Sequence, residues 1–310
     1  MNYKDWLSVW LDNAVKPTAK SRTYARYKEV VDGHVAPMLG EYELNEVTPL
    51  LLQKFVTELL TSGNLVTGKG LSANTVNTVI TVVQNSLKAA AVYGELAEYT
   101  ADRVKRPRAQ DCDVSCFSIA EQKTIEHEIL QGKKDKLFGI VLCLYTGLRI
   151  GELLALTWTD LDFNAGTLSV TKSCHYGKGA TGKFERRTEP PKTPASRRTI
   201  PLPKQMLAML KSIKKRSKSE YVVANGPNPV CVRSYQRSFT LLLRKLKIPH
   251  KGFHALRHTF ATRALECGMD VKTLSEILGH KNATVTLNRY VHSLMEHKQE
   301  MMNKVGKLLQ

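Results

Sequence analysis

The segment TGLRIGELLAL, residues 146–156, directly follows the longest apolar run of the chain, Phe138 to Leu144. The apolar run predicts a buried helix that ends at Gly147, and a second helix opens after Arg149. Arginine is rarely buried without an anionic partner, and Glu152 can reach back to Arg149 from the same helix face. This local pattern fits a purely structural Arg–Glu pair and an anion-binding site equally well.

A second informative segment is HALRHTFAT, residues 254–262. Helical spacing places His254 beside Arg257, and a titratable group next to a permanent cation suits an oxyanion such as phosphate. His254 and His258 also have the i, i+4 spacing of a zinc-protease helix. Ala255 replaces the general-base glutamate of that motif and Arg257 would put a cation beside the metal, so we expect no metal site and a buried His258.

Three further residues carry weaker signals. Gly279 in LGH fits a helix C-cap, which would leave His280 in a tight corner. Tyr290 follows ten residues later on a predicted amphipathic C-terminal helix, where a tyrosine is usually part of the core. Lys192 lies on a basic turn in the segment PPKTPASRRTIPL, where most lysines are solvated or only touch a DNA backbone. None of these three residues identifies a function by itself.

Positive charge is concentrated in the second part of the chain. The 310 residues carry a net charge of +18, with 46 basic against 28 acidic side chains. Residues 1–108 hold 13 basic and 11 acidic residues, a net of +2, whereas residues 109–310 hold 33 and 17, a net of +16. A charge this large and this uneven indicates a polyanionic partner, most often nucleic acid.

Several classes of protein are excluded by pattern. No apolar run approaches the roughly 18 residues of a membrane span, and the N-terminus MNYKDWLSVW lacks a secretion signal. The cysteines are too scattered for a disulfide-built fold, and Cys112 and Cys116 lack a second ligand pair at zinc-site spacing. We therefore expect a cytosolic protein in which all six cysteines are reduced thiols: Cys112, Cys116, Cys143, Cys174, Cys231 and Cys267.

The chain divides into two predicted domains. Residues 1–105 predict a bundle of four helices; Thr48 caps one of them, and Ser72 caps another whose Val76, Val79, Val83 and Leu87 share one face. Residues 106–117 have charge, a proline and little periodicity, which is typical of a linker. The second domain, residues 118–310, begins with the capping box of Ser118 and Glu121.

The second domain mixes helices with a small sheet. Residues 167–171 and 198–202 predict two antiparallel strands separated by a Gly-rich loop. The rest reads as helices with breaks at 225–229, 249–252, Gly268 and Gly279. The expected fold class is mainly α with a small antiparallel β-sheet, that is, α+β.

Taken together, these segments resemble one family, the tyrosine recombinases or phage-type integrases. TGLRIGELLAL, HALRHTFAT and LGH followed by Tyr290 have the order and spacing of that family. Within the family, the chain looks most like integrases of conjugative transposons and of temperate phages of Gram-positive bacteria, in which a segment like PKTPASRRTIPL is common. The resemblance implies a helical core-binding domain before a mixed α/β catalytic domain. Larger members add an N-terminal domain for arm-type DNA sites, whereas this chain begins directly in the predicted core-binding domain.

The resemblance also implies roles for individual residues. Tyr290 would attack a DNA phosphate and form a 3′-phosphotyrosyl bond. Arg149 and Arg257 would hold the non-bridging oxygens, His254 would act as acid and base, and His280 would hydrogen-bond the phosphate.

Two supporting roles complete the implied site. Lys192 would protonate the departing 5′ oxygen, although Lys172, Lys178 and Lys183 compete for this assignment. Glu152 would orient Arg149.

The implied enzyme cleaves and rejoins DNA at specific sites, integrating or excising a mobile element, with no metal, ATP or other cofactor. Its partners would be double-stranded DNA at attachment (core) sites and three further copies in a tetrameric synapse joined through the C-terminal tail helix. An excisionase or a host DNA-bending protein would assist, on the nucleoid in the bacterial cytoplasm and away from membranes. Two alternatives are a type IB topoisomerase-like activity and a non-catalytic DNA-binding regulator.

Overall fold

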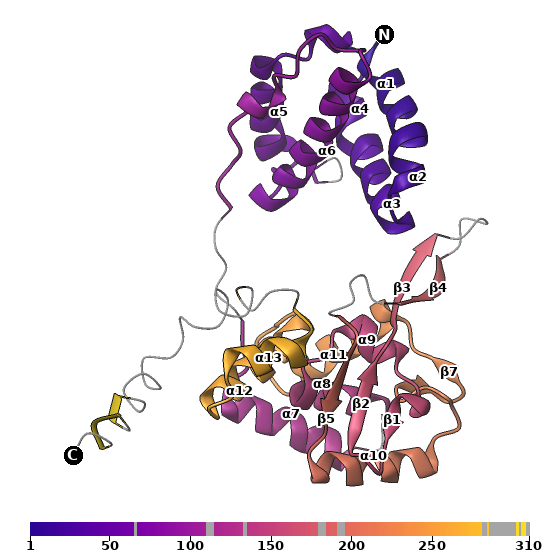
Figure 1. Ribbon diagram of the computed structural model, residues 1–310, viewed down its shortest axis with the longest axis vertical. Coiled ribbons are helices and arrows are strands. Elements are labelled where there is room, and N and C mark those ends of the chain that lie inside the picture. Colours follow the sequence, from indigo (N-terminus) through magenta and orange to yellow (C-terminus); the bar gives the residue numbers. More distant parts are fainter. Residues whose placement is uncertain are drawn as a thin grey trace. The chain divides into compact units, whose positions relative to one another are not determined.

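Two compact units, Met1–Cys112 and Asp113–Gln310, make up the chain in the computed structural model (Figure 1). The structure describes residues 1–64, 67–109, 115–132, 135–178, 184–190, 196–280, 284, 302–303 and 305–307. Within these residues the fold is mostly helical with small antiparallel sheets, which confirms the predicted fold class. None of the described helices is long and apolar enough to cross a membrane, and the five described cysteines are free thiols.

The first unit is built from four long helices in its described residues, two of which continue through a π-helical turn just before a proline. These helices are α1 (Tyr3–Trp10) continuing through Leu11–Val15 into α2 (Lys16–Thr18), α3 (Ser21–Val30) continuing through Val31–Val35 into α4 (Ala36–Leu39), α5 (Pro49–Ser62) and α6 (Ala73–Val92). Short 3₁₀ turns lie at Leu44–Glu46 and Ala101–Arg103.

Helix α6 forms the centre of this unit. It begins where the sequence predicts, because the Ser72 side chain accepts a hydrogen bond from the Thr75 N–H. Its predicted apolar face is fully buried and consists of Val76, Val79, Val83 and Leu87. The predicted bundle thus has a core of its own.

The two ends of the predicted linker, residues 106–117, are each held by the unit that they adjoin. Pro107 O accepts a 3.0 Å hydrogen bond from Asn77 Nδ2 on α6. The Phe117 N–H donates to Thr259 Oγ1 at 2.9 Å in the second unit. Both ends of the predicted linker therefore pack as parts of the units on either side.

The second unit contains seven helices and seven short strands in its described residues. The helices are α7 (Ile119–Gln131), α8 (Phe138–Thr146), α9 (Ile150–Ala155), α10 (Lys204–Arg216), α11 (Val232–Lys245), α12 (His254–Glu266) and α13 (Val271–Leu278), with 3₁₀ turns at Asp135–Leu137 and Trp158–Asp160. The strands are β1 (Leu161–Asp162), β2 (Thr167–Val170), β3 (Ser173–Lys178), β4 (Phe184–Glu189), β5 (Arg198–Pro201), β6 (Ala224–Asn225) and β7 (Asn228–Pro229).

The strands form three antiparallel sheets, β1-β2-β5, β3-β4 and β6-β7. The predicted pairing of β2 with β5 is confirmed, with Leu168 opposite Ile200. The predicted Gly-rich loop between them is wrong in part, because β3 and β4 form a hairpin there (Figure 1). Gly177 lies inside β3 opposite Glu185; glycine is depleted from strands, so the sequence pattern concealed this one.

Gly147 marks the point where three helices of the second unit meet. It ends α8 in the left-handed conformation, with φ of +64°. A Cβ atom at this position would lie 2.6 Å from Phe260 Cδ1 on α12 and 2.7 Å from Leu278 Cδ2 on α13. Glycine is therefore required here both by backbone conformation and by space.

We expect Gly147→Ala to destabilise the second unit strongly. The left-handed backbone costs alanine about 1–2 kcal/mol, and forcing a methyl group against packed side chains costs roughly 1–3 kcal/mol more. Gly268→Ala is the matched control, since Gly268 has φ of +85° but no neighbouring atom within 4 Å of the place that a Cβ would take. Urea unfolding should show the larger loss at Gly147; equal losses at the two positions would contradict the close packing.

Candidate active site

Arg149 and Glu152 form the pair that the sequence predicts. Arg149 is the residue before α9, and its backbone N–H donates to Glu152 Oε2 at 3.0 Å. Its Nη1 donates to Glu152 Oε1 at 2.8 Å. The Glu152 side chain is only 4% exposed, whereas that of Arg149 is 37% exposed. The pair therefore has a buried anion and a cation that reaches the surface.

A second arginine, which the sequence patterns did not single out, binds the same carboxylate. Arg198 opens β5, and its Nη2 and Nη1 donate to Glu152 Oε2 and Oε1 at 2.8 and 3.2 Å. Its side chain is 5% exposed. Strand alternation could have indicated that Arg198 is buried, because side chains two residues apart in a strand share a face. Arg198 thus points the same way as Ile200, which is buried.

The two arginines keep Glu152 ionised. Burial by itself would raise the pKa of this carboxyl, but the hydrogen bonds and charge of Arg198, together with Arg149, lower the pKa to about 2. Because the folded-state pKa lies below the ordinary value of 4.5, the ionised group stabilises the fold above about pH 4.5. That contribution is lost as the pH falls toward 2.

Arg257 is almost completely enclosed, with 2% of its surface exposed. It lies on α12, one turn after His254. Its Nη1 donates to Gly147 O at 2.8 Å, and its Nη2 donates to Leu278 O at 2.7 Å. The same Nη2 lies 2.8 Å from His280 Nε2. Since arginine keeps its protons, Nε2 is the acceptor in this contact, and His280 is held beside a fixed cation.

The C-terminal end of α13 is the common point of attachment. Gly279 ends the helix with φ of +65°, which confirms the predicted C-cap. Helices end with unpaired carbonyls and a partial negative charge, which favour cations there. Three successive carbonyls at this end each accept a hydrogen bond from a different arginine: Ile277 from Arg198, Leu278 from Arg257, and Gly279 from Arg149.

His254 and His258 lie next to each other on α12. Their rings are 4.6 Å apart and meet edge to face. His254 is exposed, and His258 is half-buried, so the prediction of a buried His258 is wrong. His254 is the first residue of α12, and His258 follows about one helical turn later. Among the described residues, no group of three or more His, Cys, Asp or Glu side chains is placed to hold a metal ion.

Of the four candidate lysines, the structure describes the side-chain contacts of Lys172 alone. Lys172 Nζ lies 3.0 Å from Asp160 Oδ2 and donates to Thr157 Oγ1 at 2.9 Å. Lys178 is the last residue of β3. Lys183 and Lys192, as well as Tyr290 and most of the predicted tail helix, lie outside the described residues. The structure thus brings Arg149, Glu152, Arg257 and His280 together and does not describe the predicted nucleophile or proton donor.

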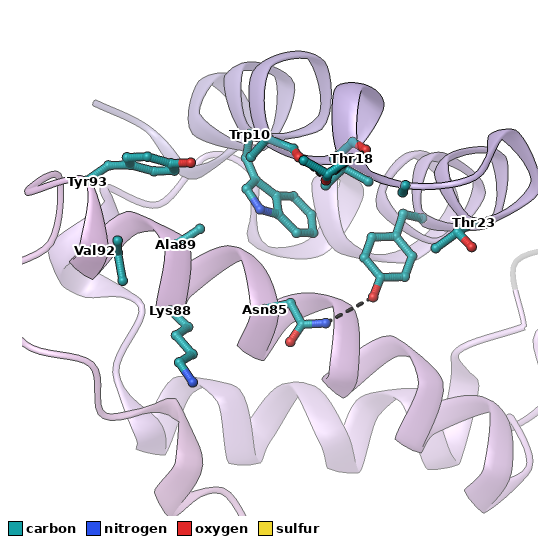
Figure 2. A pocket seen from close by; sticks show the side chains of 12 residues that line it. Trp10, Thr18, Thr23, Asn85, Lys88, Ala89, Val92 and Tyr93 are labelled. Carbon is teal, nitrogen blue, oxygen red and sulfur yellow. Dashed lines mark hydrogen bonds between the residues drawn. The ribbon is translucent and has the colours of Figure 1, made fainter.

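The first unit contains a cleft of about 420 Å³ between α1, α3 and α6 (Figure 2). Trp10 and Tyr93 lie along its walls, and Asn85 Nδ2 donates to Tyr27 Oη at 3.0 Å across it. Among the described residues that line it, Lys88 is the one charged side chain. The cleft therefore lacks the grouped charges of the arginine cluster, which consists of Arg149, Arg198 and Arg257 at the end of α13 together with Glu152.

The chain is similar to known proteins over nearly its whole length. The chain is 27% identical over 335 residues to a tyrosine recombinase XerC-like protein of Caldanaerobacter subterraneus subsp. tengcongensis, covering 98% of this chain and 82% of the relative. The Tn1549 transposon integrase, solved in complex with a circular intermediate DNA, has a TM-score of 0.81 at 22% identity, covering 98% of this chain and 99% of that chain. A lambda integrase tetramer bound to a Holliday junction has a TM-score of 0.69 at 19% identity, and the match covers 92% of this chain and 79% of that chain.

The family assignment rests on the sequence itself. Residues 2–60 match the N-terminal SAM-like domain of phage integrases. Residues 121–297, more than half of the chain, match the phage integrase family, and this range includes the whole arginine cluster and Tyr290. As the resemblance predicts, the chain belongs to the phage integrase family and is a tyrosine site-specific recombinase.

Proposed function

We propose that the arginine cluster is the centre at which this recombinase holds the phosphate of the DNA strand that it cleaves. One observation carries the proposal: three guanidinium groups donate to successive carbonyls at the end of α13, and two of them also bind the Glu152 carboxylate. Three positive charges and one negative charge leave the cluster with a charge of +2. A charged phosphate diester is the ligand that such a centre favours in DNA chemistry.

Arg149 is the arginine best placed to contact the phosphate directly. Its side chain is 37% exposed, and two of its five N–H donors are used in contacts between described residues. Arg257 and His280 supply the second contact from the neighbouring position. An arginine that stabilises the transition state of phosphoryl transfer is worth roughly 10³–10⁵ in rate.

Tyr290 is the proposed nucleophile. A tyrosine with a pKa near 10 is only about 0.1% phenolate at pH 7. It therefore needs a base or a positive surrounding, and His254 and the arginine cluster supply these in our proposal. The 3′-phosphotyrosyl bond retains the energy of the broken phosphodiester, so rejoining the strand requires no ATP. Lys192 protonates the 5′ oxygen that leaves.

The two units divide the work in this proposal. Residues 1–105 bind the core DNA site, residues 106–117 link the units, and residues 118–310 carry out the chemistry. The net charge of +16 on residues 109–310 supports further contacts to the DNA backbone, since one phosphate in the active site needs only part of it.

Assembly and regulation are proposed by analogy with the relatives. Four copies would form a synapse on two DNA sites through their C-terminal tails. The lambda integrase tetramer bound to a Holliday junction supports the number of copies. The transposon integrase bound to a circular intermediate supports a role in moving a mobile element. An excisionase or a DNA-bending protein would set the direction, on the nucleoid in the bacterial cytoplasm.

Tyr290→Phe should abolish cleavage while leaving DNA binding intact, because it removes only the hydroxyl group that attacks. The measurement is formation of a covalent protein–DNA adduct on a nicked suicide substrate, with DNA affinity measured in parallel. Tyr93→Phe, at an exposed position in the first unit, is the matched control and should give adduct normally. A Tyr290→Phe variant that still forms the adduct would show that another residue is the nucleophile.

Lys192→Ala should slow cleavage because the leaving 5′ oxygen loses its proton donor. A substrate with a 5′-bridging sulfur has a leaving group that needs no proton, so it should restore the rate of this variant. Lys172→Ala is the matched control; Lys172 is already bound to Asp160, and its variant should show no such rescue. Rescue of Lys172→Ala, Lys178→Ala or Lys183→Ala instead of Lys192→Ala would reassign the proton donor, and rescue of none would move the role to His254.

A further inference from the structure

Arg198 differs from Arg149 in how its donors are used. It makes four hydrogen bonds to described residues: to both oxygens of Glu152, to Ile277 O and to Ser196 O. Four of its five N–H donors are therefore engaged within the protein. Its side chain is 5% exposed, compared with 37% for Arg149. Arg198 thus lacks the pair of spare donors with which Arg149 can hold a DNA phosphate.

The partners of Arg198 are the same groups that hold Arg149. Glu152 accepts from Arg198 through both oxygens and from Arg149 Nη1 through Oε1. On α13, Arg198 binds the carbonyl of Ile277, and Arg149 binds that of Gly279 two residues later. Arg198 therefore binds one attachment point of the Arg149 side chain, Glu152, directly, and binds α13 two residues before the other, Gly279 O.

We propose that Arg198 is a positioning residue for strand cleavage, which clamps Glu152 to the end of α13 and thereby holds Arg149 in the orientation that meets the phosphate. The inference rests on the proposed role of Arg149 as a phosphate ligand. It assigns Arg198 no contact with DNA and no proton transfer.

The surroundings of Glu152 explain why one arginine is insufficient to keep its carboxyl ionised. Arg149 at the start of its own helix and Arg198 on β5 bind the carboxylate, and the Cys143 thiol on α8 lies close enough to interact with both Glu152 and Arg257. Cys143 is completely buried and un-ionised, since burial raises its pKa strongly. Burial favours the protonated form of Glu152. Without Arg198 the carboxyl should take up a proton within the range of assay pH, and a neutral carboxyl holds Arg149 less firmly.

The experiment measures single-turnover cleavage of a nicked suicide substrate at saturating protein from pH 5.5 to 8.5. Arg198→Met should lower the rate by about 100-fold, the order of loss that follows from a small misplacement of a catalytic group. DNA affinity should stay unchanged, because Arg198 is buried. The rate relative to the wild-type protein should fall further as the pH decreases, since Glu152 then becomes protonated.

Three further variants complete the design. Glu152→Gln combined with Arg198→Met removes the buried charge and the titrating group together, so its rate relative to the wild type should be low at every pH. Arg198→Lys keeps a charge but cannot bridge both carboxylate oxygens and Ile277, and should fall between the wild type and Arg198→Met. Arg197→Met is the matched control, since the neighbouring Arg197 is exposed, and should keep the wild-type pH profile.

The outcomes separate this inference from the proposed function. If Arg149→Met cleaves at the wild-type rate, the proposed phosphate site is wrong. If Arg149→Met is inactive while Arg198→Met matches the wild type in rate and pH profile, only the positioning role is wrong. If Arg198→Met does not fold, the double variant decides: a wild-type rate overturns the inference, and a low rate with unchanged DNA affinity supports it.

Discussion

The constraint that shapes the second unit is the burial of positive charge. Three arginines lie close together there, and one carboxylate, Glu152, offsets their charge in part. Glu152 binds Arg149 and Arg198, and the end of α13 supplies the acceptors that this carboxylate cannot. A helix C-terminus carries unpaired carbonyls and a partial negative charge, so it is suited to this role. The excess positive charge that remains is what, in our proposal, holds the DNA phosphate.

The fold serves this arrangement by bringing three helix ends together. Gly147 has no side chain, so α8 ends directly against α12 and α13. Arg257 can then donate to Gly147 O at the end of α8 and to Leu278 O at the end of α13 at the same time. A buried cation thus joins the ends of two helices and holds His280, which closely follows α13.

Local features of the site could be predicted from the sequence, and distant ones could not. Arg149 and Glu152 are three residues apart, and Gly279 follows an amphipathic helix, so helical spacing and capping rules were sufficient. Arg198 is 46 residues from Glu152, and no local rule links them. Strand alternation places Arg198 on the same face as Ile200, but it does not show that Arg198 binds Glu152.

The same distinction explains the error in the sheet. Strands β3 and β4 contain Gly177 and several charged residues, which are typical of loops. Their pairing depends on the register between the two segments and cannot be deduced from either one alone. His258 was misjudged for a related reason, because an apolar helix pattern does not show which turn faces outward at a helix start. Burial at element ends is decided by the neighbouring elements.

The central claim is that Glu152 stays ionised inside the protein because two arginines hold it. It can be tested by labelling glutamate side chains with carbon-13 and following the Glu152 carboxyl signal by NMR as the pH is lowered, with Glu152→Gln to assign the signal. We predict a pKa of about 2, so that the signal stays at its ionised position as the pH falls through the ordinary value of 4.5. A titration midpoint at that ordinary value of 4.5 or above would contradict the claim.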